Sequence, residues 1–252
     1  MSNEQFDRRR FLTVSTALGA AVATGAPLAS ADGRMIQGAI PWAPGEADAP
    51  TPVAQPGTYL FFTPDEAAFV EAATARLIPA DELGPGAREL GCPLFIDRQL
   101  AGAYGRAERW YMFGPWAQGT KTQGFQSRLT PAQFYRAAIA AIDADCRSRF
   151  DKKTFAQLDA DAQDQFLTGL ESGKISLDPV DAAAFFKQLL DNTIEGYFAD
   201  PLYGGNKDMA AWKMIGYPGA RYDYRDYVAK HGERFPLPPV AILGRPAWSP
   251  KS

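Results

Sequence analysis

Three helix starts of the same kind constrain the fold of this chain more than any other feature. They are Thr63-Pro64-Asp65-Glu66, Thr130-Pro131-Ala132-Gln133 and Asp178-Pro179-Val180-Asp181. In each, a side chain able to accept backbone N–H groups precedes a proline, which fits the first helical position because no hydrogen-bond partner is needed there. The first two also place Glu or Gln three residues after the threonine, where its side chain can accept the backbone N–H of that threonine. We therefore predict helices that open at these three points.

Apolar residues follow each start at helical spacing. The expected buried stripes are Ala68, Phe69, Ala72, Ala73 and Leu77; then Phe134, Ala138, Ile139, Ile142 and Cys146, in a helix ending near residue 149; then Phe185, Phe186, Leu189, Leu190, Ile194 and Tyr197. Shorter helices are expected at 93–103 and 160–171. Because no strands alternate with these segments, we predict a mainly α fold. It is a single irregular helical domain over 59–252, with long loops rich in glycine, proline and aromatic residues.

Residues 1–31 have the pattern of an export signal. Arg8, Arg9, Phe11 and Leu12 are similar to the twin-arginine pattern, and Ala29 and Ala31 form a small-x-small cleavage site. The weakly apolar stretch between them is shorter than the ~20 residues of a transmembrane helix. An ordinary secretory signal is the alternative. We expect twin-arginine export, which carries folded proteins, and a periplasmic location.

Residues 32–58 hold five prolines and four glycines, so their apolar residues do not recur at the spacing of a helix or a strand. We predict a flexible arm that can order against a partner.

The composition argues against several function classes. The net charge is -3, without the basic excess of a nucleic-acid-binding domain. One histidine, His231, and two cysteines are too few for a zinc, haem or iron–sulfur site built from this chain's own side chains. His231 lies in a polar run, where we expect it to be solvated rather than the base of a catalytic triad.

Two groups of carboxylates, Asp81-Glu82 and Asp143 with Asp145, are the remaining catalytic candidates. A glycoside hydrolase needs two acids across a sugar. Neighbouring acids on helices are more often solvated, so we predict no catalytic, cofactor-binding or metal-binding residue. A hydrolase stays a third hypothesis.

Cys92 and Cys146 have three alternatives outside the cytoplasm: a bridge to each other, a bridge to a partner chain, or two free buried thiols. The internal disulfide is the one we favour.

The segment 199–222 carries the positive signal. Glycine turns alternate with large aromatic side chains, a composition enriched at protein interfaces. Asn206 is expected to cap a short helix that holds Met209, Trp212 and Ile215. The predicted partner-binding residues are Tyr203, Asn206, Trp212 and Tyr217. A loop packed on its own core is the alternative.

This segment, from Asp200 to Asp208 and on through Trp212-Lys213 to Gly219, resembles the gluconate 2-dehydrogenase subunit 3 family. Upstream stretches also fit: Phe62-Thr63-Pro64-Asp65-Glu66, Leu77-Ile78-Pro79-Ala80-Asp81, Pro93-Leu94-Phe95-Ile96-Asp97 and the twin-arginine leader. The resemblance covers most of residues 60–220.

The resemblance implies a small subunit of a membrane-associated, flavin-dependent sugar or sugar-acid dehydrogenase. FAD and the active site would lie in a large flavoprotein partner, and a multihaem cytochrome c would pass electrons on. The small subunit would bind, stabilise and export the flavoprotein, using the twin-arginine translocase. A free-standing periplasmic sugar-binding protein, with the aromatic loop stacked on a sugar, is the alternative.

Overall fold

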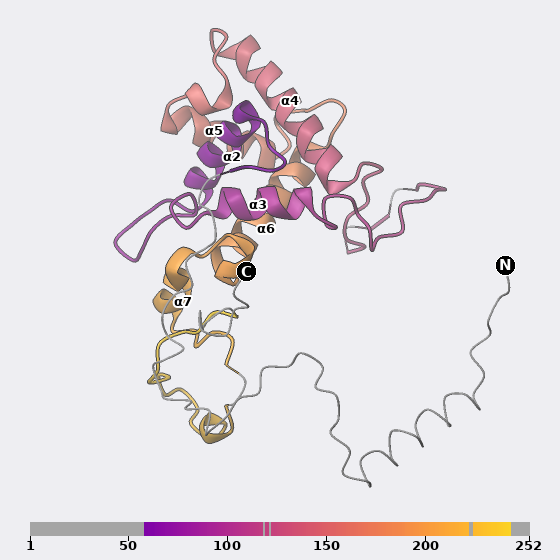
Figure 1. Cartoon of the computed structure of the whole chain (residues 1–252). Helices are drawn as coiled ribbons and strands as arrows, with labels where there is room; N and C mark the ends of the chain where they lie inside the picture. Colours follow the sequence, from indigo (N-terminus) through magenta and orange to yellow (C-terminus); the bar gives the residue numbers. More distant parts are fainter. Residues whose placement is uncertain (1–57, 118, 121, 222–223, 243–252) are drawn as a thin grey trace, which may run out of the picture. The chain divides into compact units, whose positions relative to one another are not determined.

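The structure is a computed structural model that describes residues 58–117, 119–120, 122–221 and 224–242. The predicted signal peptide and all but the last residue of the predicted arm lie outside this range, as do residues 243–252. Six α-helices form the described part: α2 (Pro64–Leu77), α3 (Cys92–Ala101), α4 (Pro131–Arg149), α5 (Ala160–Glu171), α6 (Ala182–Phe198) and α7 (Ala210–Ile215) (Figure 1). Four 3-10 turns accompany them: Phe155–Gln157, Pro201–Tyr203, Lys207–Met209 and Arg225–Tyr227.

The prediction of a mainly α fold is confirmed. Within the described ranges there is no strand, only two isolated bridges, Asp81 with Gly84 and Gly219 with Val240. None of the helices in these ranges is long and apolar enough to cross a membrane.

The first two predicted helix starts have the expected capping boxes. The Thr63 hydroxyl accepts the Glu66 N–H at 3.4 Å, and the Glu66 carboxylate accepts the Thr63 N–H at 2.8 Å. Thr130 and Gln133 repeat the arrangement. These reciprocal bonds satisfy N–H groups that the helix itself leaves without acceptors.

The third start was placed too early. The helix α6 begins at Ala182, because the Asp181 carboxylate, not the Asp178 side chain, accepts the Ala184 N–H at 2.8 Å. Val180 is then free to pack into the core.

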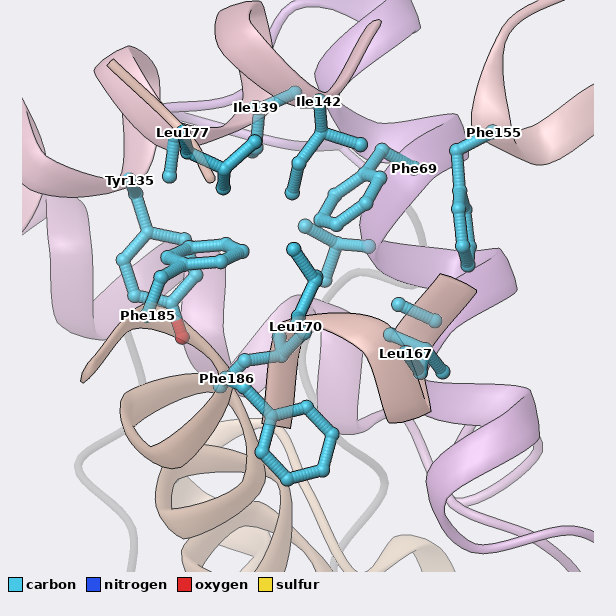
Figure 2. Close-up of a cluster of buried hydrophobic side chains, with 14 of the residues drawn as sticks. Phe69, Tyr135, Ile139, Ile142, Phe155, Leu167, Leu170, Leu177, Phe185 and Phe186 are labelled. Atoms are coloured by element: carbon cyan, nitrogen blue, oxygen red, sulfur yellow. The ribbon is translucent and has the colours of Figure 1, made fainter. Parts of the chain in front are cut away.

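Aromatic side chains join the helices into one large hydrophobic cluster (Figure 2). The Phe69 ring of α2 lies 5.1 Å from Phe155 and 6.2 Å from Phe185 of α6, and Phe185 lies 5.3 Å from Tyr135 of α4. The whole predicted stripe of α4 is buried. Among the other expected core residues, Ala68 and Ile194 are exposed, and Ala72, Leu77 and Leu190 are half-buried. The buried face of α2 is rotated relative to the predicted stripe, so that Ala67 and Val70 are buried beside Phe69.

A buried carboxylate fixes the segment before α2. Asp97 of α3 is fully buried and accepts the N–H groups of Leu60, Phe61 and Phe62 at 2.6, 2.9 and 2.8 Å. Two of the stretches that resemble the family, around Phe62 and around Asp97, are thus joined in one hydrogen-bonded unit.

Candidate partner-binding surface

The segment after α6 folds back along that helix because two glycines allow close backbone contact. A Cβ atom at Gly205 would lie 2.0 Å from the Gly196 carbonyl oxygen of α6, a distance no side chain tolerates. Gly204 has a φ of 103°, which glycine adopts without strain. The Gly-Gly pair therefore positions the following residues against the core.

Asn206 holds this segment together from within. Its side chain is fully buried, donates to the Ala199 carbonyl at 2.9 Å and accepts the Ala211 N–H at 3.0 Å. Asn206 thus accepts a backbone N–H in the first turn of α7, but the predicted capping position is not correct, because the N-cap residue of α7 is Met209. Burial leaves Asn206 no surface for direct contact with a partner, so its role is to support the loop.

Trp212 is also internal. It is 5% exposed, donates from Nε1 to the Phe198 carbonyl at 2.8 Å and packs with Met209 and Ala241. The Tyr217 ring stands edge-on to it at 5.1 Å. For Trp212, the alternative of a self-packed loop describes the structure better than direct partner contact.

Tyr203 and Tyr217 remain accessible, with 46% and 47% of their surface exposed. They belong to a group of exposed large apolar side chains carried by this segment and by its neighbours. We call this group the α7 surface: Leu83, Phe198, Leu202, Tyr203, Met214, Ile215 and Tyr217. The turn that holds Leu83 lies beside α7, because a Cβ atom on Gly84 would be 3.7 Å from the Met214 sulfur. Such groups of exposed apolar residues mark interaction sites.

The last described residues brace the same segment. The Asp200 carboxylate, which is buried, accepts N–H groups from Leu202 at 2.9 Å and from Ile242 at 2.7 Å. The Ala220 N–H donates to the Val240 carbonyl at 2.7 Å. The α7 surface therefore stands on a hydrogen-bonded scaffold, which is the pre-organisation that reduces the entropy lost on binding.

A second exposed aromatic group lies in the long loop between α3 and α4, where sequence reasoning singled out nothing. Trp110, Tyr111 and Phe113 are exposed, and the rings of Tyr111 and Phe113 are 5.9 Å apart. The run Trp110-Tyr111-Met112-Phe113 was the signal available in the sequence, because four large apolar residues in succession fit neither helical nor strand periodicity in a loop.

The favoured internal disulfide is not present. Cys92 and Cys146 are both free, buried thiols. They pack in different hydrophobic clusters, Cys92 with Leu90 and Tyr197, and Cys146 in the large core with Ile142. Burial raises the pKa of each thiol to about 12. The structure therefore has two free, buried thiols in place of the favoured internal bridge.

Of the carboxylates considered for catalysis, Asp81, Asp143 and Asp145 have structural partners. Asp81 accepts the N–H groups of Leu83 and Gly84, which closes a turn. Asp145 pairs with Arg149 at 2.9 Å, and Asp143 lies 3.7 Å from Arg147. Burial raises the pKa of Asp143. His231 is exposed, as predicted.

Among the described residues, no group of three or more His, Cys, Asp or Glu side chains is placed to hold a metal ion.

In the comparison with known proteins, no curated protein and no solved structure matched this chain. A sequence model of one family, described as "Gluconate 2-dehydrogenase subunit 3", matches residues 64–219. The match runs from the first residue of α2 to Gly219, four residues after the end of α7, and so includes all seven residues of the α7 surface and every buried residue of the large core except Phe62. Because it covers more than half of the sequence, the chain belongs to the gluconate 2-dehydrogenase subunit 3 family.

Proposed function

We propose that this chain is the non-catalytic small subunit of a periplasmic, membrane-associated gluconate 2-dehydrogenase-type complex. In that complex it binds and stabilises a large FAD-containing flavoprotein, which oxidises a sugar or sugar acid. Electrons then pass to an acceptor, for which a multihaem cytochrome c subunit is the natural candidate. Flavin chemistry belongs to the partner, and no step of it is assigned to a residue of this chain.

The α7 surface is the observation that carries this proposal. Seven large apolar side chains are exposed on this segment, on the end of α6 and on the neighbouring turn at Leu83. The buried residues of the segment, Asn206, Asp200 and Trp212, are hydrogen-bonded or packed. A segment built only to cover the core would not need apolar side chains on its outer side. Aromatic and aliphatic side chains held on a fixed backbone are what a stable subunit interface uses. The family name supports the same conclusion, because it denotes a subunit of a dehydrogenase.

Export is the second half of the proposed function. Arg8, Arg9, Phe11 and Leu12, with the cleavage site at Ala29 and Ala31, support it from the sequence alone. Since the twin-arginine translocase moves folded proteins, a signal on this subunit is able to carry a bound flavoprotein with it. The export signal and the α7 surface then serve one task.

The test is to express the tagged full-length chain in its native host and to purify it from the periplasm. We expect a larger protein with a flavin absorbance spectrum to co-purify, and to disappear from the periplasm in the Arg8→Lys/Arg9→Lys variant. A colourless, solitary, folded chain would contradict the proposal and favour a free-standing periplasmic sugar-binding protein.

Surface variants locate the contact. Ile215→Glu, which puts a charge at a 57% exposed position of the α7 surface, should abolish co-purification without altering the circular dichroism of the isolated chain. Leu60→Glu is the matched control, because Leu60 is even more exposed but lies before α2. Equal loss of the flavoprotein in both variants would show that the α7 surface is not the interface.

A further inference from the structure

The loop between α3 and α4 begins the longest stretch of the chain without an acidic side chain. No Asp or Glu occurs between Glu108 and Asp143, although the sequence holds 29 acidic residues in all. Residues 106–130 contain one acidic and four basic residues, which gives a net charge of +3 in a chain whose net charge is -3. The basic residues are Arg106, Arg109, Lys121 and Arg128. The loop is therefore a positive segment of an acidic protein.

Two of these cations are available to an external anion. Arg106 neutralises Glu108, because its Nε atom lies 2.7 Å from a carboxylate oxygen of that residue. Arg109 and Arg128 are exposed, and neither has a carboxylate partner in the part of the chain that the structure describes. Their guanidinium groups can therefore donate hydrogen bonds to a phosphate without first breaking an ion pair.

Large apolar side chains stand beside these charges in residues 109–117, which we call the aromatic loop. Tyr111 and Phe113 are 79% and 76% exposed. Their rings are 5.9 Å apart, and among the described residues neither side chain has another ring contact or a hydrogen bond. Two neighbouring rings thus stand in water, which is unfavourable until another surface covers them.

The base of the aromatic loop is held by the core. Trp110 stands edge-on to Tyr104 at 5.7 Å and packs on Phe125 at 5.0 Å, and Phe125 reaches Phe134 of α4 at 5.9 Å. From this base the loop extends beyond the end of α3 (Figure 1). Because Tyr111 and Phe113 are not packed on the helices, they can enter an apolar surroundings without disturbing the core.

A membrane surface suits this combination better than another protein does. Aromatic side chains are favoured at the level of the lipid headgroups, and a cluster of cations is attracted to anionic phospholipids. The α7 surface differs, because exposed charges of both signs, Asp208 and Lys213, lie on its segment. Around the aromatic loop the charges without a partner are all positive, which complements a surface of one sign, such as an anionic bilayer.

We propose that the aromatic loop binds the surface of a membrane that contains anionic phospholipids. Tyr111 and Phe113 enter the headgroup region, and Arg109 and Arg128 contact lipid phosphates. The proposed complex is membrane-associated as a whole, whereas this inference assigns a direct membrane contact to this chain. It involves no residue of the α7 surface and needs no flavoprotein, so its failure would leave the proposed subunit function untouched.

A fluorescent label in the aromatic loop tests the contact directly. The full chain with Ala117→Cys, an exposed position, is labelled with an iodoacetamide derivative of the dye NBD, which the buried native thiols should not react with. Vesicles of phosphatidylcholine and phosphatidylglycerol at about three to one should shift its emission to the blue and raise it severalfold. The same label at Ser172→Cys, exposed after the end of α5, is the control and should not respond.

This readout separates the loop from the N-terminal leader. A leader that binds vesicles would bring the chain to the bilayer without placing residue 117 in it. An unchanged emission at residue 117, or an equal response at residue 172, overturns the proposal. An equal response to vesicles of phosphatidylcholine alone also overturns it, because the charge argument would then be wrong.

Variants that carry the label at residue 117 test the named side chains. Tyr111→Ser/Phe113→Ser should weaken vesicle binding at least tenfold, and Arg109→Gln about fivefold. Leu60→Ser/Ile215→Ser is the matched control, because it removes two exposed apolar side chains elsewhere and should leave binding unchanged. Thermal melts check that each variant is folded. Equal losses in the control and the aromatic variant overturn the proposal. So does a Tyr111→Ser/Phe113→Ser variant that keeps its vesicle binding but no longer co-purifies the flavoprotein, since the loop would then contact a protein.

Discussion

Replacing Asp97 by asparagine tests whether one carboxylate secures the beginning of the helical domain. In the structure both oxygens of Asp97 are used: Oδ1 accepts from Phe61 and Phe62, and Oδ2 accepts from Leu60. Asparagine has nearly the same shape, and its oxygen can keep the first two bonds. Its amide nitrogen would then face the Leu60 N–H, so that two donors meet.

The expected loss follows from those contacts. One hydrogen bond to a charged group contributes about 1.5–3 kcal/mol, and the unpaired Leu60 N–H adds a desolvation cost of about 1–3 kcal/mol. We expect a total of about 3–5 kcal/mol, a large part of the roughly 5–15 kcal/mol that stabilises an ordinary domain. At about 2–4 °C per kcal/mol for a chain of this length, the melting temperature should fall by roughly 6–20 °C.

Urea unfolding followed by circular dichroism measures this loss. Asp164→Asn is the matched control, because Asp164 also binds through both oxygens, to Arg76, but has 47% of its side chain exposed. An exposed ion pair contributes at most about 1 kcal/mol. If Asp97→Asn cost no more than Asp164→Asn, the reasoning from buried N–H groups would be wrong.

Three further predictions concern other parts of the chain. Cys92 and Cys146 should resist iodoacetamide in the native protein, because their thiols are buried and have raised pKa values. After unfolding without a reducing agent, mass spectrometry should find two labels per chain; the absence of any label would mean that the two cysteines form a disulfide. Gly205→Ala should lower stability by about 1–3 kcal/mol or more in a thermal melt, since its Cβ would meet the Gly196 carbonyl at 2.0 Å, whereas Gly102→Ala, with its nearest atom at 3.3 Å, should cost less. Folding raises the pKa of Asp143, so this carboxyl group holds its proton to a higher pH in the folded state than in the unfolded state. The free energy of unfolding should therefore fall as the pH rises from the ordinary carboxyl pKa to the raised value. Asp143→Asn should remove this fall, as measured by urea titrations at pH 4 to 7.

Local signals predicted the helices well. Thr63 and Thr130 begin helices where the capping pattern placed them, and the α4 stripe from Phe134 to Cys146 is buried as its spacing indicated. These features depend on neighbours within one or two turns, which the sequence displays directly. The start of α6 was misplaced because Asp178 and Asp181 both resemble caps, and only the packing of Val180 selects between them.

The candidate site was predicted less completely, because burial there depends on distant residues. Trp212 and Tyr217 look alike in the sequence, yet Trp212 is covered by Ala241 and bonded to Phe198, whereas Tyr217 stays half-exposed. No local sequence pattern predicts that residues near 240 pack against this loop.

The brace between Val240 and the loop after α7 sets an order of events during synthesis. Ala220, Val240, Asp200 and Ile242 make their hydrogen bonds only after residues 238–242 have left the ribosome, well after α7 itself. A nascent chain that already holds the large core therefore still lacks the finished α7 surface. If that surface receives the flavoprotein, the two can join only after residues 238–242 have emerged, so a chain truncated before residue 238 would not carry the flavoprotein to the translocase.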